Sequence, residues 1–351
     1  MAVDTQTMEA PRAFAPSMKV RTEKELILAT KQFAQEIRAK SWWHLVSTSM
    51  LMATFYFVIF WPTTPIWLKA IASVLTGLTI ARMFIIYHDH QHKAILQKSK
   101  IADAFMTLFG LYILAPTSIW KRSHDHHHTH NSKLYTSSIG SYPIVTTEKF
   151  KSFTKKERAV YLFIRHPITI AFGYIFVFLF GMCVRYFINN RAKHWDSLLA
   201  LILHVGVGTT IVLTLGWTAF WLGFIAPAVI SLGLGAYLFY AQHNFPTATF
   251  SDKEGWSYVN AALGSSSYMR MSKIMHWFTG NIGFHHVHHL NARIPFYRLP
   301  EAHKAIPELK NAKTTSLMPG EMIRCLRLKV WDPVKGRMIG FKEMNWKSSK
   351  V

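Results

Sequence analysis

The chain has 351 residues, half of them hydrophobic and 14% aromatic, with 40 Lys and Arg against 18 Asp and Glu. This composition is typical of an integral membrane protein and argues against a pair of soluble domains. The net charge of +22 comes without a zinc-finger, basic-zipper or RNA-binding signature, so we expect anionic lipid and an acidic protein as partners and no nucleic acid. The two cysteines are too few for a disulfide framework or a cysteine zinc site.

Residues 1–40 are polar and then mixed in charge, and they show no signal peptide. We expect a disordered start followed by a surface helix. Two nearly uncharged segments come next, at 42–61 and 66–87, and each is long enough to cross a bilayer core as a helix. Lys and Arg residues come before the first segment and after the second, whereas the turn between the two segments has none. That pattern predicts that the N-terminus and His88 lie in the cytoplasm.

Four further apolar segments follow. Residues 101–119 are apolar for only about 14 residues before Pro116, which favours an interfacial or re-entrant segment over a crossing. The other three are 168–188, 198–216 and 217–240, and the polar residues 131–166 before them predict a cytoplasmic loop with one surface helix. From residue 298 onward the chain is basic, and we expect it to pack as a cytoplasmic cap.

Three histidine clusters stand out, at 88–92, 124–128 and 285–289, and they contain 11 of the 19 histidines. Residues three or four apart on a helix share a face. The first cluster offers such a pair and each of the others offers three such histidines. These candidate ligands are His88, His92, His124, His127, His128, His285, His288 and His289.

Imidazole is the commonest protein metal ligand and suits Fe, Zn, Cu and Ni. Eight imidazole nitrogens are too many for one ion, so we interpret the clusters as a dinuclear centre. His243 leaves the last apolar segment on the same side and is a candidate ninth ligand. The off-frame residues His90, His126 and His286 are expected to point away from the metals. A loose surface metal scavenger is the alternative to a built site.

A shared site requires an even number of crossings between His128 and His285. One of the last three apolar segments must therefore fail to cross, and we expect it to be 217–240, broken into a re-entrant hairpin by Pro227, Gly233 and Gly235. The prediction is an all-α integral membrane fold with about four transmembrane helices, re-entrant or interfacial segments and a cytoplasmic helical cap that carries the histidine site.

The acidic residues near the clusters have smaller predicted roles. Asp89 and Asp125 are each either a partner that orients a ligand imidazole or a solvated surface carboxylate. A set of neutral imidazoles without a Glu-x-x-His pair differs from the carboxylate-rich di-iron bundles. At a membrane surface it suggests oxygen chemistry on a substrate dissolved in the bilayer, with the apolar helices positioning one carbon beside the metals.

At these residues the sequence resembles the integral-membrane fatty acid desaturases. Their boxes H-x-x-x-H, H-x-x-H-H and H-x-x-H-H match the three clusters, and their additional histidine matches His243. Residues 262–268, 277–284 and 294–297 are similar to the bacterial omega-6 (Δ12) acyl-lipid branch. The resemblance covers residues 40–310. Asp89-His90-Gln91 inside the first box departs from the small residue or Cys that is commoner in this branch.

The resemblance implies two non-haem iron ions, O₂ as co-substrate and a double bond introduced into a fatty acyl chain. It also implies electrons from a separate ferredoxin or cytochrome b5, because no His-Pro-Gly-Gly haem-binding word occurs. Such donors are typically acidic, which gives a basic cytoplasmic surface a use in steering association. The expected location is a multi-pass membrane protein with its active site on the cytoplasmic face.

Two other functions stay open at this point. A hydroxylase or ketolase of the same superfamily, acting on alkane, sphingolipid or carotenoid, shares the hydrogen-abstraction step. A non-enzymatic metal carrier would need ionisable residues inside its spans, and here these are mainly His204 and Arg185. The predicted domains are residues 1–40 as an N-terminal tail, 41–310 as the membrane desaturase domain and 311–351 as a basic cytoplasmic tail.

Overall fold

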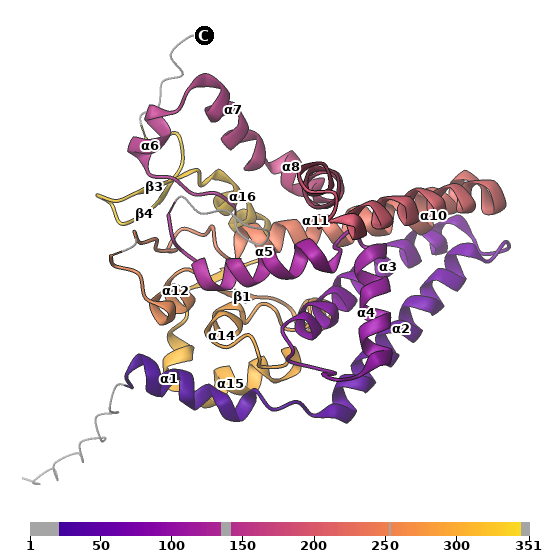
Figure 1. The fold of residues 1–351 in the computed structure, drawn as a ribbon, viewed down its shortest axis with the longest axis horizontal. Helices are drawn as coiled ribbons and strands as arrows, with labels where there is room; N and C mark the ends of the chain where they lie inside the picture. Colours follow the sequence, from indigo (N-terminus) through magenta and orange to yellow (C-terminus); the bar gives the residue numbers. More distant parts are fainter. Residues whose placement is uncertain (1–20, 135–141, 253, 345–351) are drawn as a thin grey trace, which may run out of the picture.

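The computed structural model describes residues 21–134, 142–252 and 254–344, and its long helices extend to one side while shorter elements gather on the other (Figure 1). The disordered start expected for the N-terminus falls in residues 1–20, outside the described residues. The expected surface helix is α1 (Glu23–Thr30), followed by η1 (Lys31–Phe33). Thr22 and Glu25 form a capping box that satisfies two backbone N–H groups at the start of α1.

Helices α2 (Arg38–Phe60) and α3 (Ile66–Gln91) form an antiparallel hairpin, close to the two predicted spans. Their environments differ. Trp43, Met50 and Phe57 of α2 are 60–68% exposed, whereas Met83 and Ile86 of α3 are fully buried. Helix α3 is therefore the central helix of the bundle, and it delivers the first histidine cluster to the interior.

Helices α4 (Lys100–Tyr112) and α5 (Thr117–His130) replace the short apolar segment predicted at 101–119, and they meet at an angle of 91°. Pro116 causes the break, since a proline disfavours helical backbone at the residue before it. Leu114, two residues earlier, has a positive φ of 57°. The bend turns α5 back across the protein and carries the second histidine cluster toward the first.

The next helices are α6 (Thr147–Ser152), α7 (Lys155–Ile164), α8 (Pro167–Ala171), the π-helix η2 (Tyr174–Val184) and α9 (Arg185–Asn189). Two short helices thus occupy the described part of 131–166, where we expected one. The turns that follow α8 are viewed nearly end-on in Figure 1, whereas α10 and α11 lie along the picture plane. The apolar segment predicted at 168–188 therefore runs crosswise to the long helices.

Helix α10 (Trp195–Phe220), the π-helix η3 (Trp221–Ile225) and α11 (Ala226–Ala241) form one helical run of 47 residues that folds back on itself. Gly216 (φ 81°, ψ 177°) makes the reversal. The ring of His204 lies 4.6 Å from that of Phe224, although residues 20 apart in a straight helix would be about 30 Å apart. Residues 195–215 and 217–241 are therefore two antiparallel arms.

The break expected within 217–240 is wrong, because the chain stays helical through Pro227, Gly233 and Gly235. Pro227 stands where the π-helix η3 passes into α11, so the chain changes helix type there without breaking. Gly233 serves close packing instead: a Cβ there would lie 2.5 Å from the carbonyl oxygen of Ala171. This glycine lets the crosswise segment lie directly on α11.

The last third of the described chain forms an irregular cap with short elements. Its helices are α12 (Tyr258–Gly264), α13 (Lys273–Phe278), α14 (His285–Leu290), η4 (Phe296–Arg298), α15 (Leu299–Ala305), η5 (Pro307–Asn311) and α16 (Pro319–Arg327). Strand β1 (Tyr268–Arg270) pairs in parallel with β2 (Thr314–Ser316), and β3 (Val330–Asp332) pairs antiparallel with β4 (Arg337–Ile339). The structure is mostly helical, as predicted, and these two small sheets are the exception, since strands of three residues are too short to show alternation.

Among the described residues, three helices are able to cross a membrane by length and composition: α2, α3 and the run from α10 to α11. The bent pair of α4 and α5 would be a fourth if it formed one span. The reversal at Gly216 makes two arms of the third. The hairpin of α2 and α3 and the hairpin formed by residues 195–241 point the same way. The contact that shows this is Gly223 of η3 against the ring of Phe60, at the end of α2 that is far from the histidines. At the other end, Ser118 of α5 donates from its backbone N–H to Asp196 at the start of α10, at 3.0 Å.

Candidate metal centre

The fold brings all nine predicted ligand histidines together. His88 lies in the last turn of α3, and His92 is the residue at which that helix ends. Helix α5 supplies His124, His127 and His128, and α14 supplies His285, His288 and His289. His243 follows the end of α11. The end of the long helix α11 thus brings His243 to the other histidines.

The first group takes one ring nitrogen from each of five histidines, all within 4.8 Å of one another: His88, His92, His124, His128 and His288. Four of the Nε2 atoms form a row in which each is within 3.2 Å of the next. They are separated by 2.9 Å from His88 to His124, 3.2 Å from His124 to His128 and 3.0 Å from His128 to His288. The Nε2 atom of His92 is also buried and has no hydrogen-bond partner among the described residues.

The second group consists of His127, His243, His285 and His289, again with one nitrogen each within 4.8 Å. The Nε2 atoms of His243 and His285 are 2.9 Å apart, those of His285 and His289 are 3.1 Å apart, and those of His289 and His127 are 3.2 Å apart. Each group draws on more than one histidine cluster, so each depends on the whole fold.

These spacings fit metal coordination. At a metal–nitrogen distance of about 2.1 Å, two ligands at a right angle to each other are about 3.0 Å apart. The observed separations of 2.9–3.2 Å are of this size. Among the described residues no carboxylate belongs to either group. The donor set is therefore all imidazole, which suits iron as well as Zn, Cu and Ni.

Burial keeps the imidazoles of His285, His288, His289 and His243 in the neutral form that binds metals. It lowers the pKa of His285, His288 and His289 well below the ordinary value, and the neighbouring histidines lower each pKa further. Burial also lowers the pKa of His243 to about 4, although the hydrogen bond to the Ser265 carbonyl opposes this. At neutral pH each of these rings therefore keeps a lone pair for a metal.

Two of the candidate ligands, His88 and His243, are held in orientation by hydrogen bonds on the side of the ring that faces away from the group. The Nδ1–H of His88 donates to Oδ1 of Asp89 at 3.0 Å, and Oδ2 of Asp89 accepts from the backbone N–H of Phe296 at 2.6 Å. The Nδ1–H of His243 donates to the carbonyl of Ser265 at 2.9 Å. Each bond fixes the tautomer and leaves Nε2 facing its group. Of the two roles considered for Asp89, the hydrogen bond to His88 and its burial support that of an orienting partner.

The off-frame histidines point elsewhere, as their spacing predicted. His90 pairs with Asp103 at 3.0 Å, and the exposed His126 stacks on His130 with ring centroids 3.9 Å apart. His286 is buried, but its Nε2 faces His303 and the carbonyl of Leu309, away from both groups. Asp125 is an exposed carboxylate that pairs with Lys121.

Sequence reasoning missed three supporting contacts. The indole of Trp120 stacks on His124 with ring centroids 4.7 Å apart and an angle of 14°. The hydroxyl of Tyr258 donates to the carbonyl of His289 at 2.6 Å, which holds the last turn of α14. The third contact is the hydrogen bond from His243 to the carbonyl of Ser265. Trp120 was within reach of a prediction, since it precedes His124 by four residues on one helix.

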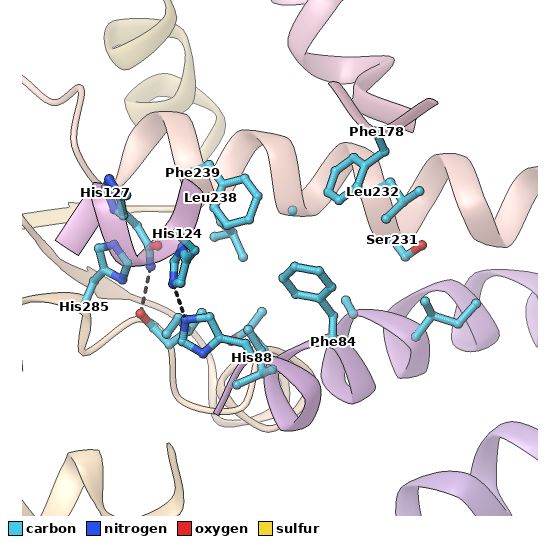
Figure 2. Close-up of a pocket in the computed structure, with 17 residues that line it drawn as sticks. Phe84, His88, His124, His127, Phe178, Ser231, Leu232, Leu238, Phe239 and His285 are labelled. Atoms are coloured by element: carbon cyan, nitrogen blue, oxygen red, sulfur yellow. Dashed lines mark hydrogen bonds between the residues drawn. The ribbon is translucent and has the colours of Figure 1, made fainter. Parts of the chain in front are cut away.

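A narrow apolar cavity leads away from the histidines between α3 and α11 (Figure 2). Figure 2 shows His88, His124, His127 and His285 at one end and Phe178, Leu232 and Ser231 at the other. Helix α3 lines it with Ile80, Ala81, Phe84 and Ile85, and α11 with Ser231, Leu232, Gly235, Leu238 and Phe239. Of the lining residues that the structure describes, none is Asp, Glu, Lys or Arg.

Comparison with known proteins is consistent with this geometry. The family model described as fatty acid desaturase matches residues 64–315. The chain belongs to the fatty acid desaturase family. It is therefore an enzyme, an oxidoreductase, and the metal-carrier hypothesis is wrong.

Curated relatives span most of the chain. It is 30% identical over 322 residues to the "Fatty acid desaturase" of Bacillus subtilis, an alignment that covers 91% of both chains. It is 24% identical over 289 residues to the "sn-1 oleoyl-lipid 12-desaturase" of Anabaena variabilis, covering 79% of each. It is also 24% identical to the "sn-1 acyl-lipid omega-3 desaturase (ferredoxin)" of Nostoc sp., covering 74% of this chain and 69% of that protein.

Proposed function

We propose that this desaturase holds two iron ions in its two histidine groups and introduces a Δ12 (omega-6) double bond into a fatty acyl chain carried by a lipid. One observation carries the proposal: nine histidines, eight of them buried and His92 half-buried, converge as two groups at the end of an apolar cavity. The lipid carrier and the double-bond position rest on the 12-desaturase relative from Anabaena variabilis and on the similarity of residues 262–268, 277–284 and 294–297 to that branch.

In this proposal His88, His92, His124, His128 and His288 hold one iron, and His127, His243, His285 and His289 hold the other. When bound, the iron pair supplies the O₂-derived oxidant that no side chain provides. The protein's own contribution is positional. The cavity begins at His88, His124, His127 and His285, so a hydrocarbon lying in it has one carbon beside the metals.

The cavity also disfavours water at the reaction, because apart from the histidines and Ser231, Gln242 and Thr279 its walls are formed by aliphatic and phenylalanine side chains and a glycine. Removing two hydrogens from the acyl chain supplies two electrons and two protons. Reduction of O₂ to two waters needs four of each, so two further electrons and two protons must come from outside. Among the described residues the site offers no cysteine that could donate them, since Cys183 and Cys325 both lie outside the two groups.

The external donor is proposed to be an acidic redox protein, either a ferredoxin or a cytochrome b5. A ferredoxin is suggested by the Nostoc relative, whose name includes ferredoxin. The net charge of +22 supports an acidic partner, because complementary charge accelerates association.

We propose four membrane crossings, made by α2, α3 and residues 195–215 and 217–241. The two hairpins point the same way, and Asp196, at the start of the first α10 arm, bonds to the histidine-bearing helix α5. In this arrangement α4 and the segment from α8 to α9 lie at the membrane interface, and all nine histidines lie on one side of the membrane. The Lys and Arg flanking the first hairpin assign that side to the cytoplasm.

The membrane desaturase domain is proposed to be residues 41–310, with residues 1–40 and 311–351 as cytoplasmic tails. The family match to residues 64–315 supports its core. The pairing of β2 with β1 ties the start of the last tail to the cap that carries α14.

The test is a fatty acid profile, measured by gas chromatography and mass spectrometry, from a host that expresses this chain with a ferredoxin system. His288→Ala and His126→Ala are compared with the wild type, since one changes a proposed ligand and the other an exposed histidine. We expect a new acyl chain unsaturated at carbon 12 in the wild type and in His126→Ala, and none in His288→Ala. An unchanged wild-type profile from an iron-loaded protein would contradict the proposal.

A further inference from the structure

A second pocket lies beside the apolar cavity and is separate from it. It has a volume of about 520 Å³ and is lined by residues of α2, α3, β1, α13, η4 and the start of α15. No described residue lines both spaces. Thr279 and Ile282 face the apolar cavity, whereas Trp277 and Asn281 face the second pocket. The segment 277–282 therefore forms the wall between the two, and we name the second one the Arg82 pocket.

The Arg82 pocket is cationic. Arg82 and Lys273 line it, and among its described lining residues none is Asp or Glu. Neither cation forms an ion pair with an acidic residue in the ranges 21–134, 142–252 and 254–344. Arg82 is only 2% exposed. A buried charge without an opposite charge is costly, so the pocket favours an anionic ligand.

The guanidinium of Arg82 keeps donors in reserve. Its Nε–H donates to the hydroxyl of Thr48 at 3.1 Å, one Nη1–H donates to the carbonyl of Trp277, and one Nη2–H donates to Nδ1 of His44 at 3.1 Å. A guanidinium has five N–H groups, so one remains on each Nη. Because arginine only donates, Nδ1 of His44 accepts and the ring proton of His44 is on Nε2. His44 also lines the pocket and adds a further donor.

Two aromatic rings hold this guanidinium in place. Its central carbon lies 4.0 Å from the ring centroid of Trp277 and 5.7 Å from that of Phe296. Stacking and three hydrogen bonds fix the plane of the group before a ligand arrives. A fixed planar guanidinium matches the geometry of phosphate oxygens, and its hydrogen bonds to them are assisted by charge.

The surroundings of the Arg82 pocket are those of a membrane surface. Trp277 is 41% exposed and Ile274, on the same short helix α13, is 69% exposed. Trp43, the neighbour of His44 in α2, is 68% exposed. Exposed tryptophans are typical of the layer where bilayer and water meet, which is also the layer of the lipid headgroups. A phosphate that reaches this pocket is therefore expected to belong to a lipid.

We propose that the Arg82 pocket binds the phosphate group of a membrane phospholipid. The phosphate oxygens accept from the two remaining N–H groups of Arg82 and from Nε2–H of His44, and Lys273 supplies a second positive charge at the rim. The inference rests on the proposed function only for the arrangement of the helices in the membrane. It adds a headgroup site that lies outside the histidine groups.

The test is lipid binding by the purified full-length enzyme in dodecyl maltoside, a detergent without phosphate, measured by native mass spectrometry and isothermal titration calorimetry. The probes are dihexanoyl phosphatidylglycerol, a digalactosyl lipid with the same acyl chains but no phosphate, and inorganic phosphate. Arg82→Gln and Lys273→Gln each remove one charge from the pocket. Lys304→Gln is the matched control, because Lys304 is an exposed lysine of the cap that does not line the pocket.

We expect the wild type to bind one phosphatidylglycerol per chain, at least about tenfold more tightly than the galactolipid, as hydrogen bonds to a charged group allow. Arg82→Gln should weaken this binding by at least about tenfold. Lys273→Gln should weaken it by about threefold, because an exposed charge contributes less. Lys304→Gln should bind like the wild type. Since Lys273 is on the surface, its replacement decides the question even if Arg82→Gln does not fold.

Three results would overturn the proposal. The first is a galactolipid that binds as tightly as phosphatidylglycerol, and the second is a folded Lys273→Gln or Arg82→Gln variant that binds phosphatidylglycerol like the wild type. The third is inorganic phosphate that binds as tightly as phosphatidylglycerol, which would remove the lipid as the source of the phosphate. A wild type that binds phosphatidylglycerol as expected but desaturates no acyl chain would contradict the proposed function and support the headgroup site.

Discussion

Asp89 is the side chain whose replacement tests the metal centre most selectively. Its buried carboxylate accepts two hydrogen bonds, from Nδ1–H of His88 at 3.0 Å and from the backbone N–H of Phe296 at 2.6 Å. In Asp89→Asn one carboxylate oxygen becomes an NH₂ group, which cannot accept either bond. One buried N–H must then go unsatisfied, at a cost of about 1–3 kcal/mol.

If the lost bond is the one to His88, the ring loses its fixed orientation. Loss of such a supporting partner typically costs ~10–100-fold in metal affinity, or about 1.4–2.8 kcal/mol. Asp125→Asn is the matched control, because Asp125 is exposed and its pair with Lys121 is a surface salt bridge worth at most about 1 kcal/mol. Helix α5 should be unaffected by it.

The assay is iron retained per chain during titration with a chelator, together with conversion of the acyl substrate. We expect Asp89→Asn to release iron at a chelator concentration at least about tenfold lower than the wild type does. Asp125→Asn should follow the wild-type curve. If the two variants release iron at the same concentration, the orienting role of Asp89 is refuted.

Three other predictions follow from the same structure. His128→Ala should lower activity by more than the ~10–100-fold expected for a supporting partner, whereas His126→Ala should keep wild-type activity in the same assay, and equal activities would remove His128 from the ligand set. Gly233→Leu should destabilise the protein by at least about 1–3 kcal/mol in a thermal unfolding assay, because its Cβ would overlap Ala171, whereas Gly206→Leu has open space and should unfold like the wild type. Removal of iron by a chelator should lower the melting temperature, since a metal at 100 times its Kd stabilises the folded state by about 2.7 kcal/mol, and an unchanged melting temperature would argue against a metal that is bound to the folded state.

The histidines that meet in the two groups were within reach of sequence reasoning because their signal is local. The i, i+3, i+4 spacing on a helix determines which ring faces which neighbour, and it separates His127 and His128 from His126 without any knowledge of the fold. Asp89 was within reach for the same reason, since it adjoins His88. The partition into groups of five and four was not, because His288 and His289 of one helix face different groups.

The path of the chain through the bundle was harder to predict. Hydropathy marks 168–188 as apolar but carries no information on direction, so the crosswise packing of this segment on α11 was missed. Gly233 was interpreted as a helix breaker, whereas its role depends on the Ala171 carbonyl, 62 residues earlier in the chain. Contacts between distant segments decide such cases.

The central claim is that the two histidine groups hold two iron ions. Its most direct test is quantitative iron analysis of the purified full-length protein, combined with Mössbauer spectroscopy of the iron-57-loaded enzyme. We predict two irons per chain in the wild type and in His126→Ala, with fewer in His288→Ala and in His285→Ala, which remove one ligand from each group. One iron or none in a folded, active wild-type enzyme would contradict the account.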